Sequence, residues 1–133
     1  MNNSHMASEK LLQAMRLAEE ASRAYDEGDN FGVVIRAMRL IETLSKFLLV
    51  LHGHYVAEDE APNYLVLIDG SPKEEKFASK LITMYRKLYF SYHAEESSLI
   101  GSVNIRGAEV KELKEELRSL VEEAYQIYDE YHL

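Results

Sequence analysis

Four long segments of the chain repeat their apolar side chains every three or four residues. This spacing places the apolar positions on one face of an α-helix. It predicts helices over about 8–27, 31–52, 71–93 and 108–131. The broadest apolar stripe belongs to the second segment and comprises Val34, Ala37, Ile41, Leu44, Leu48 and Leu51. The sequence therefore predicts an all-α protein, a bundle of four main helices with the second helix at its centre.

Local signals mark where these helices end and begin. Gly28 followed by Asp29 is typical of a helix stop and a new N-terminal cap. Gly53 is expected at the glycine position that follows the second helix. Ser71 and Glu74 are spaced as a capping box, with a proline at the first helical position between them. Short connections of this kind favour antiparallel neighbours.

Two stretches lack a clear helical pattern. Residues 64–68 have the composition of a short strand. Because no second strand is predicted to pair with it, we expect 54–70 to be a loop or irregular turn packed on the bundle. Residues 94–107 are expected to form a loop or a frayed extension of the third helix.

The composition fits one folded domain and excludes several kinds of site. The chain has 133 residues, of which 47% are hydrophobic and 29% charged. The absence of cysteine excludes disulfides, cysteine-based zinc sites and thiol nucleophiles. The net charge of −8 argues against a general nucleic-acid binder, because phosphate binding needs a positive surface. No apolar run approaches the ~18–20 residues of a membrane span, so no membrane association is expected.

The first residues resemble a cloning-site remnant. We interpret 1–8 as an expression-tag remnant and 9–133 as a single helical domain. The domain starts directly on a helical pattern rather than on a secretory signal, which favours a cytoplasmic protein.

Arg86 and His93 are the candidate catalytic pair. They lie seven residues apart, so on an unbroken helix they differ by about 20° in direction and by roughly 10.5 Å in height. A neutral histidine can take a proton from a hydroxyl group, and arginine stabilises the charge that builds on a phosphoryl group. Metal-independent RNA cleavage needs this pairing. The alternative is an exposed arginine and a histidine that interacts with the helix dipole.

The segment that carries this pair is basic. Residues 73–93 contain five basic and two acidic side chains within an acidic chain. Such a strip suits the phosphate of RNA or a nucleotide. The alternative is a helix face that pairs with the acidic fourth helix.

Tyrosines form two helical stripes, one of Tyr85, Tyr89 and Tyr92 and one of Tyr125, Tyr128 and Tyr131. Tyrosine stacks on bases and is favoured at interfaces, so Tyr89 and Tyr92 are candidate substrate-binding residues. A dimer surface and a core rim with wet hydroxyl groups are the alternatives.

A metal site is not expected. His52 and His54 precede the carboxylates of 58–60, and both residue types are suitable metal ligands. Their spacing matches no known metal motif, and the chain has no glycine-rich phosphate loop. The sequence therefore predicts neither a metal nor a cofactor.

The run from Arg86 to His93, an arginine and a histidine separated by six residues, resembles the motif of the HEPN superfamily, in which four to six residues separate the pair. The helix order over 9–133 is also similar to these small domains of prokaryotic toxin–antitoxin systems. The resemblance implies a homodimer whose two Arg–His motifs face a shared cleft. Active members are metal-independent ribonucleases, whereas others bind nucleotides or partner proteins such as a nucleotidyltransferase or an antitoxin.

The resemblance transfers only Arg86 and His93 as a catalytic pair. Lys87 stands where many active members carry a polar uncharged residue, and we assign it as a phosphate contact. A rival resemblance covers 12–47, which looks like a helical hairpin of the tetratricopeptide or MIT type. That resemblance implies a non-catalytic protein-interaction module. The sequence leaves open whether the chain is an enzyme.

Overall fold

The computed structural model describes the backbone over residues 3–97 and 107–132, and the side chains over 3–90 and 109–132. This part of the chain is all-α, as predicted. Its elements are α1 (Asn3–Asp26), α2 (Asn30–Leu51), the 3-10 helix η1 (Glu58–Leu67), α3 (Pro72–Ser97) and α4 (Gly107–Glu130). None of the described helices is both long enough and apolar enough to span a membrane.

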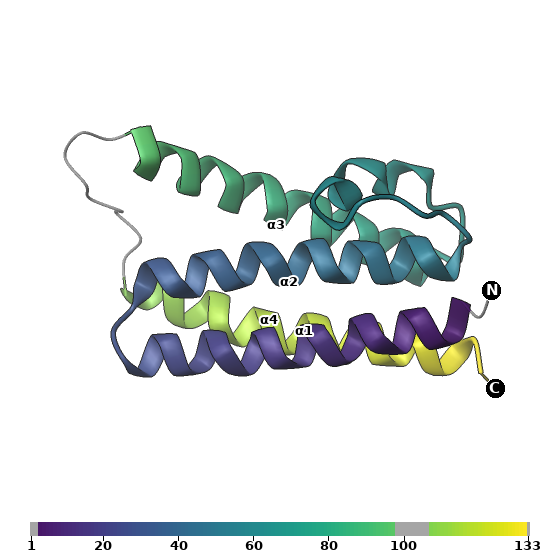
Figure 1. The fold of residues 1–133 in the computed structure, drawn as a ribbon, viewed down its shortest axis with the longest axis horizontal. Helices are drawn as coiled ribbons and strands as arrows, with labels where there is room; N and C mark the ends of the chain where they lie inside the picture. Colours follow the sequence, from purple (N-terminus) through teal and green to yellow (C-terminus); the bar gives the residue numbers. More distant parts are fainter. Residues whose placement is uncertain (1–2, 98–106, 133) are drawn as a thin grey trace.

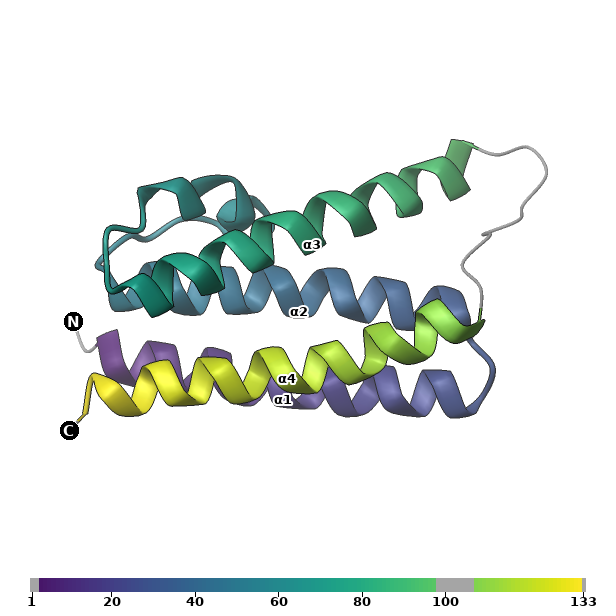
Figure 2. The ribbon, with the colours of Figure 1, turned by 180° about the vertical axis from the view of Figure 1, so that it is seen from behind.

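The helices α1, α2 and α4 pack lengthwise, and α1 and α2 form an antiparallel hairpin (Figure 1). The helix α3 starts against α2 at the end of the bundle where the two termini lie. It then diverges from α2 and α4 toward its own C-terminal end (Figure 2). The 3-10 helix η1 lies beside α2 and the first half of α3. One half of α3 is therefore part of the bundle and the other half stands away from it.

The core is built around α2, as the breadth of its apolar stripe predicts. Thirteen of its residues are buried, and Phe47, Leu48, Leu49 and Val50 are each 0% exposed. The buried face of α1 is narrow and consists mainly of alanines (Ala7, Ala14, Ala18, Ala21 and Ala24). Small side chains at these positions let the α1 and α2 backbones approach closely. Burial of large side chains is therefore concentrated on α2.

The caps form where the sequence predicts them. Gly28 and Gly53 have φ angles of 77° and 80°, a left-handed conformation that glycine adopts without strain. Asp29 accepts a hydrogen bond from the backbone N–H of Gly32 at 2.8 Å. A side-chain carbon at Gly32 would come within 2.2 Å of that carboxylate, so the cap also needs a glycine there.

Two helix boundaries and one loop differ from the prediction. The helix α1 begins at Asn3 rather than near residue 8, because Ala7 continues the buried alanine stripe and Met6 packs against the core. The stretch 54–70, expected to be a loop or irregular turn, contains the 3-10 helix η1, and the run 64–68 lies at the end of this helix rather than in a strand. The helix α3 continues to Ser97, beyond the predicted end at 93.

Candidate functional site

The outer face of α3 carries Arg86. The helix is unbroken from Pro72 to Ser97, so the backbone condition for placing positions 86 and 93 on one face is met. The Arg86 side chain is exposed and forms no ion pair with any side chain in 3–90 or 109–132. Beside it on the helix surface, Tyr89 is 47% exposed and Phe90 is 80% exposed. Arg86 is thus a solvent-accessible cation next to two accessible aromatic rings.

Two of the predicted site residues, Tyr92 and His93, have side chains that lie outside the described residues. Their backbones belong to α3. The structure therefore describes the side chains of Arg86, Lys87 and Tyr89. For Tyr92 and His93 it describes only the backbone.

Two lysines of the basic strip form ion pairs with α4 and remain partly exposed to solvent. Lys73 forms an ion pair with Glu130 at 2.8 Å, and Lys80 forms one with Glu123 at 2.6 Å. Both lysines and both glutamates are spaced seven residues apart in the sequence. Two turns of each antiparallel helix separate the two ion pairs, so the pairs follow one another along the contact between α3 and α4. We call this contact the α3–α4 seam and each lysine–glutamate position along it a rung. For these two lysines the structure agrees with the alternative given above, a helix face that pairs with the acidic fourth helix.

Lys87 lies one further heptad along the same face of α3. It lines a cleft of about 250 Å³ between α3 and α4, with Glu116 on the opposite wall. The apolar floor comprises Met84, Leu88 and Leu113, and the α4 rim comprises Glu109, Glu112 and Glu116. Because one residue on a helix corresponds to a turn of about 100°, Lys87 and Arg86 point in different directions.

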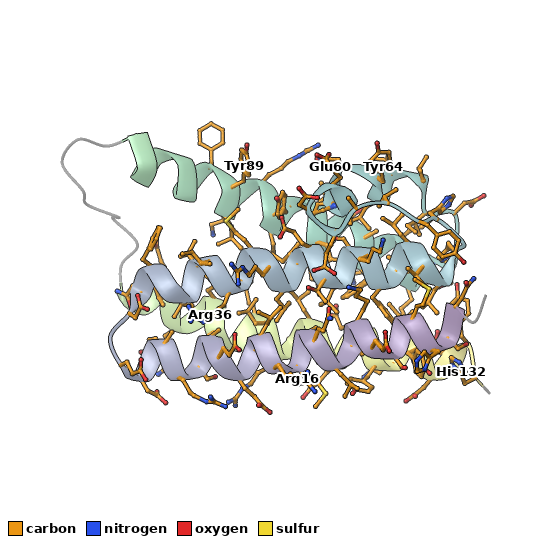
Figure 3. All side chains as sticks on the ribbon, viewed as in Figure 1. Arg16, Arg36, Glu60, Tyr64, Tyr89 and His132 are labelled. Carbon is orange, nitrogen blue, oxygen red and sulfur yellow. The ribbon has the colours of Figure 1, made fainter. Side chains whose placement is uncertain are left out.

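The α4 tyrosines make contacts within the chain. The hydroxyl of Tyr125 lies 2.9 Å from the sulfur of Met15, and the ring of Tyr128 lies 6.5 Å from that of Phe47. These tyrosines form a rim of the core, whereas Tyr89 on α3 is directed outward (Figure 3).

A hydrogen-bonded cluster around the buried Glu74 joins three helix ends and was not predicted. Nε2 of His52 lies 2.5 Å from the Glu74 carboxylate, and the hydroxyl of Tyr131 donates to the same oxygen at 2.8 Å. Glu74 is only 6% exposed. Burial alone would raise the pKa of Glu74, but hydrogen bonds from His52, Tyr131 and the Ser71 backbone outweigh it and lower that pKa. Among the described side chains, no group of three histidines or carboxylates is arranged to hold a metal.

A second polar cleft, of about 600 Å³, lies between α1, α2 and η1. Arg16, Arg39, Glu42 and Asp59 are among its lining residues. Burial raises the pKa of Glu42; the hydrogen bond from Tyr85 opposes this, and the charges of Asp59 and Glu58 add to it. Sequence spacing gave no signal for this cleft, because its walls come from three separate elements.

The chain matches no protein-family model, no curated protein and no solved structure.

Proposed function

We propose that this chain is a HEPN-like domain that engages RNA or nucleotide phosphate through the outer face of α3. In this proposal the chain acts as a homodimer, and Arg86 and His93 of each copy work at a shared cleft. The observation that carries it is the exposed Arg86 beside Tyr89 and Phe90 on an unbroken helix. A guanidinium binds phosphate in a planar, bidentate geometry, and the aromatic rings offer stacking surfaces for bases.

The electrostatics of α3 favour the outer face over the face that looks toward α4. On the inner face, Lys73 and Lys80 are neutralised by α4 glutamates, and Lys87 stands opposite Glu116. An RNA phosphate at that seam would meet carboxylates within a few ångströms. Arg86 has no such competitor among the described side chains, so it is the better anchor for phosphate.

In the proposed chemistry, His93 accepts the proton of a ribose 2′-hydroxyl, which attacks the adjacent phosphorus. A P–O bond forms to the 2′-oxygen and the bond to the 5′-oxygen of the next nucleotide breaks. Arg86 stabilises the added negative charge on the phosphoryl oxygens. The protonated His93 returns this proton to the leaving 5′-oxygen, so charge and atoms balance without a metal or a redox partner.

RNA cleavage in the presence of EDTA tests this function. Wild-type protein is expected to cleave, and Arg86→Ala and His93→Ala are each expected to lower the rate by about 100-fold or more, the scale typical of a lost transition-state contact. Arg23→Ala on α1 and His54→Ala after α2 remove the same residue types elsewhere and should leave the rate unchanged. Intact RNA after incubation with wild-type protein would exclude the ribonuclease activity.

Exposed apolar side chains favour a second candidate, a non-catalytic protein-interaction module. Val66 and Leu67 of η1 are 77% and 49% exposed, in addition to Phe90 on α3. Tyr64 of η1 and Tyr89 of α3 lie along the same edge of the molecule (Figure 3). Sedimentation of the purified chain distinguishes a homodimer, which the first candidate requires, from a monomer, which favours the module.

A further inference from the structure

The α3–α4 seam is a ladder of lysine and glutamate positions, and its third rung coincides with a cleft. The positions Lys73, Lys80 and Lys87 repeat every seven residues on α3, and Glu130, Glu123 and Glu116 repeat in the opposite direction on α4. The first two rungs are closed ion pairs. By this register the third rung would join Lys87 to Glu116. The two do not form an ion pair; they line the cleft between the diverging helices.

The cleft has the lining of a binding site for a partner. Its floor comprises Met84 and Leu88 from α3 and Leu113 from α4, and Leu88 is only 6% exposed. Three exposed glutamates, at positions 109, 112 and 116, form the α4 rim. No cation among residues 3–90 and 109–132 forms an ion pair with any of these three. The apolar floor and the acidic rim therefore both lack a complement in this part of the chain.

We propose that this cleft binds a basic amphipathic helix of a partner protein. Leucine-like side chains of the partner would cover Met84, Leu88 and Leu113, while its lysines or arginines would pair with the α4 glutamates. This is the recognition of a helix in a groove, with apolar anchors and charge complementarity at the rim. The site is separate from the outer face of α3 and does not depend on the ribonuclease proposal.

A partner of opposite charge fits this cleft better than RNA or a second copy. RNA would be repelled by the three glutamates. A second copy carries the same net charge of −8, and its α4 surface is acidic as well. A basic helix gains from both features of the site, because it buries the apolar floor and pairs with the exposed glutamates of the α4 rim.

The test uses a synthetic helical peptide of leucine and lysine with all leucines on one face. Its control is the same peptide with every lysine replaced by glutamate. Binding is measured by calorimetry, and the site is located by NMR of the methionine methyl groups. Met84 is in the cleft floor, whereas Met6, Met15 and Met38 are not among the lining residues and serve as internal references.

The lysine peptide is expected to shift the Met84 methyl signal, and the glutamate peptide is not. Glu112→Lys combined with Glu116→Lys should weaken binding by about tenfold or more, equivalent to roughly 1.4 kcal/mol. The matched control combines Glu115→Lys with Glu122→Lys, which makes the same charge change on exposed positions of α4 outside the cleft lining. It should bind like the wild type, and thermal melts verify that both variants fold.

Three results would overturn the proposal. One is binding without a shift at Met84, which would mean attraction to the acidic surface in general. Another is equal loss of affinity in the two charge variants. The third is a stable dimer in sedimentation whose cleft becomes accessible to the peptide only when the dimer dissociates. A second copy of the chain would then occupy the cleft. Loss of RNA cleavage in Arg86→Ala would not change the outcome of these peptide-binding and sedimentation measurements.

Discussion

His52 and Glu74 lie 2.5 Å apart, Nε2 to Oε2, and connect the C-terminal end of α2 to the first turn of α3. Glu74 is also the third residue of α3 and closes its capping box, since its other oxygen accepts from the Ser71 backbone N–H at 3.1 Å. One buried carboxylate thus serves both the helix start and the contact between helices. Tyr131 adds the end of α4 to the same cluster, so the half of α3 that stays in the bundle is the half held by these bonds.

Gly70→Ala is expected to destabilise the fold through this cluster. A side-chain carbon at position 70 would stand 2.8 Å from Oε1 of Glu74 and 2.9 Å from Cε1 of His52. Overpacking of a filled site costs about 1–3 kcal/mol. Chemical denaturation measures the loss. In the background of Glu74→Ala the same substitution should cost much less, and an equal cost in both backgrounds would show that the clash is not with Glu74.

Acid should weaken the fold in a way that depends on Glu74. Its pKa is lowered in the folded state, so the folded protein prefers the ionised form. This contribution is present above the usual carboxyl pKa of about 4.3 and is lost as the pH falls through the lowered value. Glu74→Gln should therefore flatten the decline of unfolding free energy between about pH 5 and pH 3. Glu75→Gln, an exposed neighbour in the same turn, should keep the wild-type decline.

Glu42→Gln is expected to act in the opposite direction. The pKa of Glu42 is raised, so ionisation costs stability as the pH rises through and above the usual carboxyl range. A glutamine removes that cost and can still accept the hydrogen bond that Tyr85 donates at 3.0 Å. The melting temperature should rise at pH 7 and return toward the wild-type value in mild acid. Glu19→Gln on the exposed face of α1 is the control, and a drop in melting temperature at pH 7 for Glu42→Gln would contradict the prediction.

Ser71→Ala tests the start of α3. The Ser71 hydroxyl accepts from the Glu74 backbone N–H at 3.2 Å, and loss of such a cap costs on the order of 1 kcal/mol. Ser79→Ala, at an exposed position within the same helix, removes a hydroxyl without removing a cap. Unfolding in urea compares the two. Equal stability of both variants would show that the capping box contributes nothing measurable.

The presence of four helices and the residues that cap them can be predicted from the sequence alone. Apolar periodicity and the chemistry of Asp29, Ser71 and Glu74 act over one or two turns, so they can be read without knowing what lies nearby. The start of α1 could not be predicted in this way. Ala7 belongs to the buried alanine stripe of α1, but its burial depends on the helices that pack against it. The spacing of Arg86 and His93 predicted their shared place on one helix.

Which charged side chains pair with one another depends on how the helices pack. The contacts of His52 with Glu74 and of Lys73 with Glu130 join residues far apart in the chain, and they depend on how each helix is rotated and offset against the next. The seven-residue spacing of lysines on α3 and glutamates on α4 is present in the sequence. These residues pair only because the two helices pack antiparallel in a register that places them opposite one another. That register also explains why Lys87 and Glu116 face each other across an open cleft. The divergence of α3 is a property of packing between segments and leaves no local mark in the sequence.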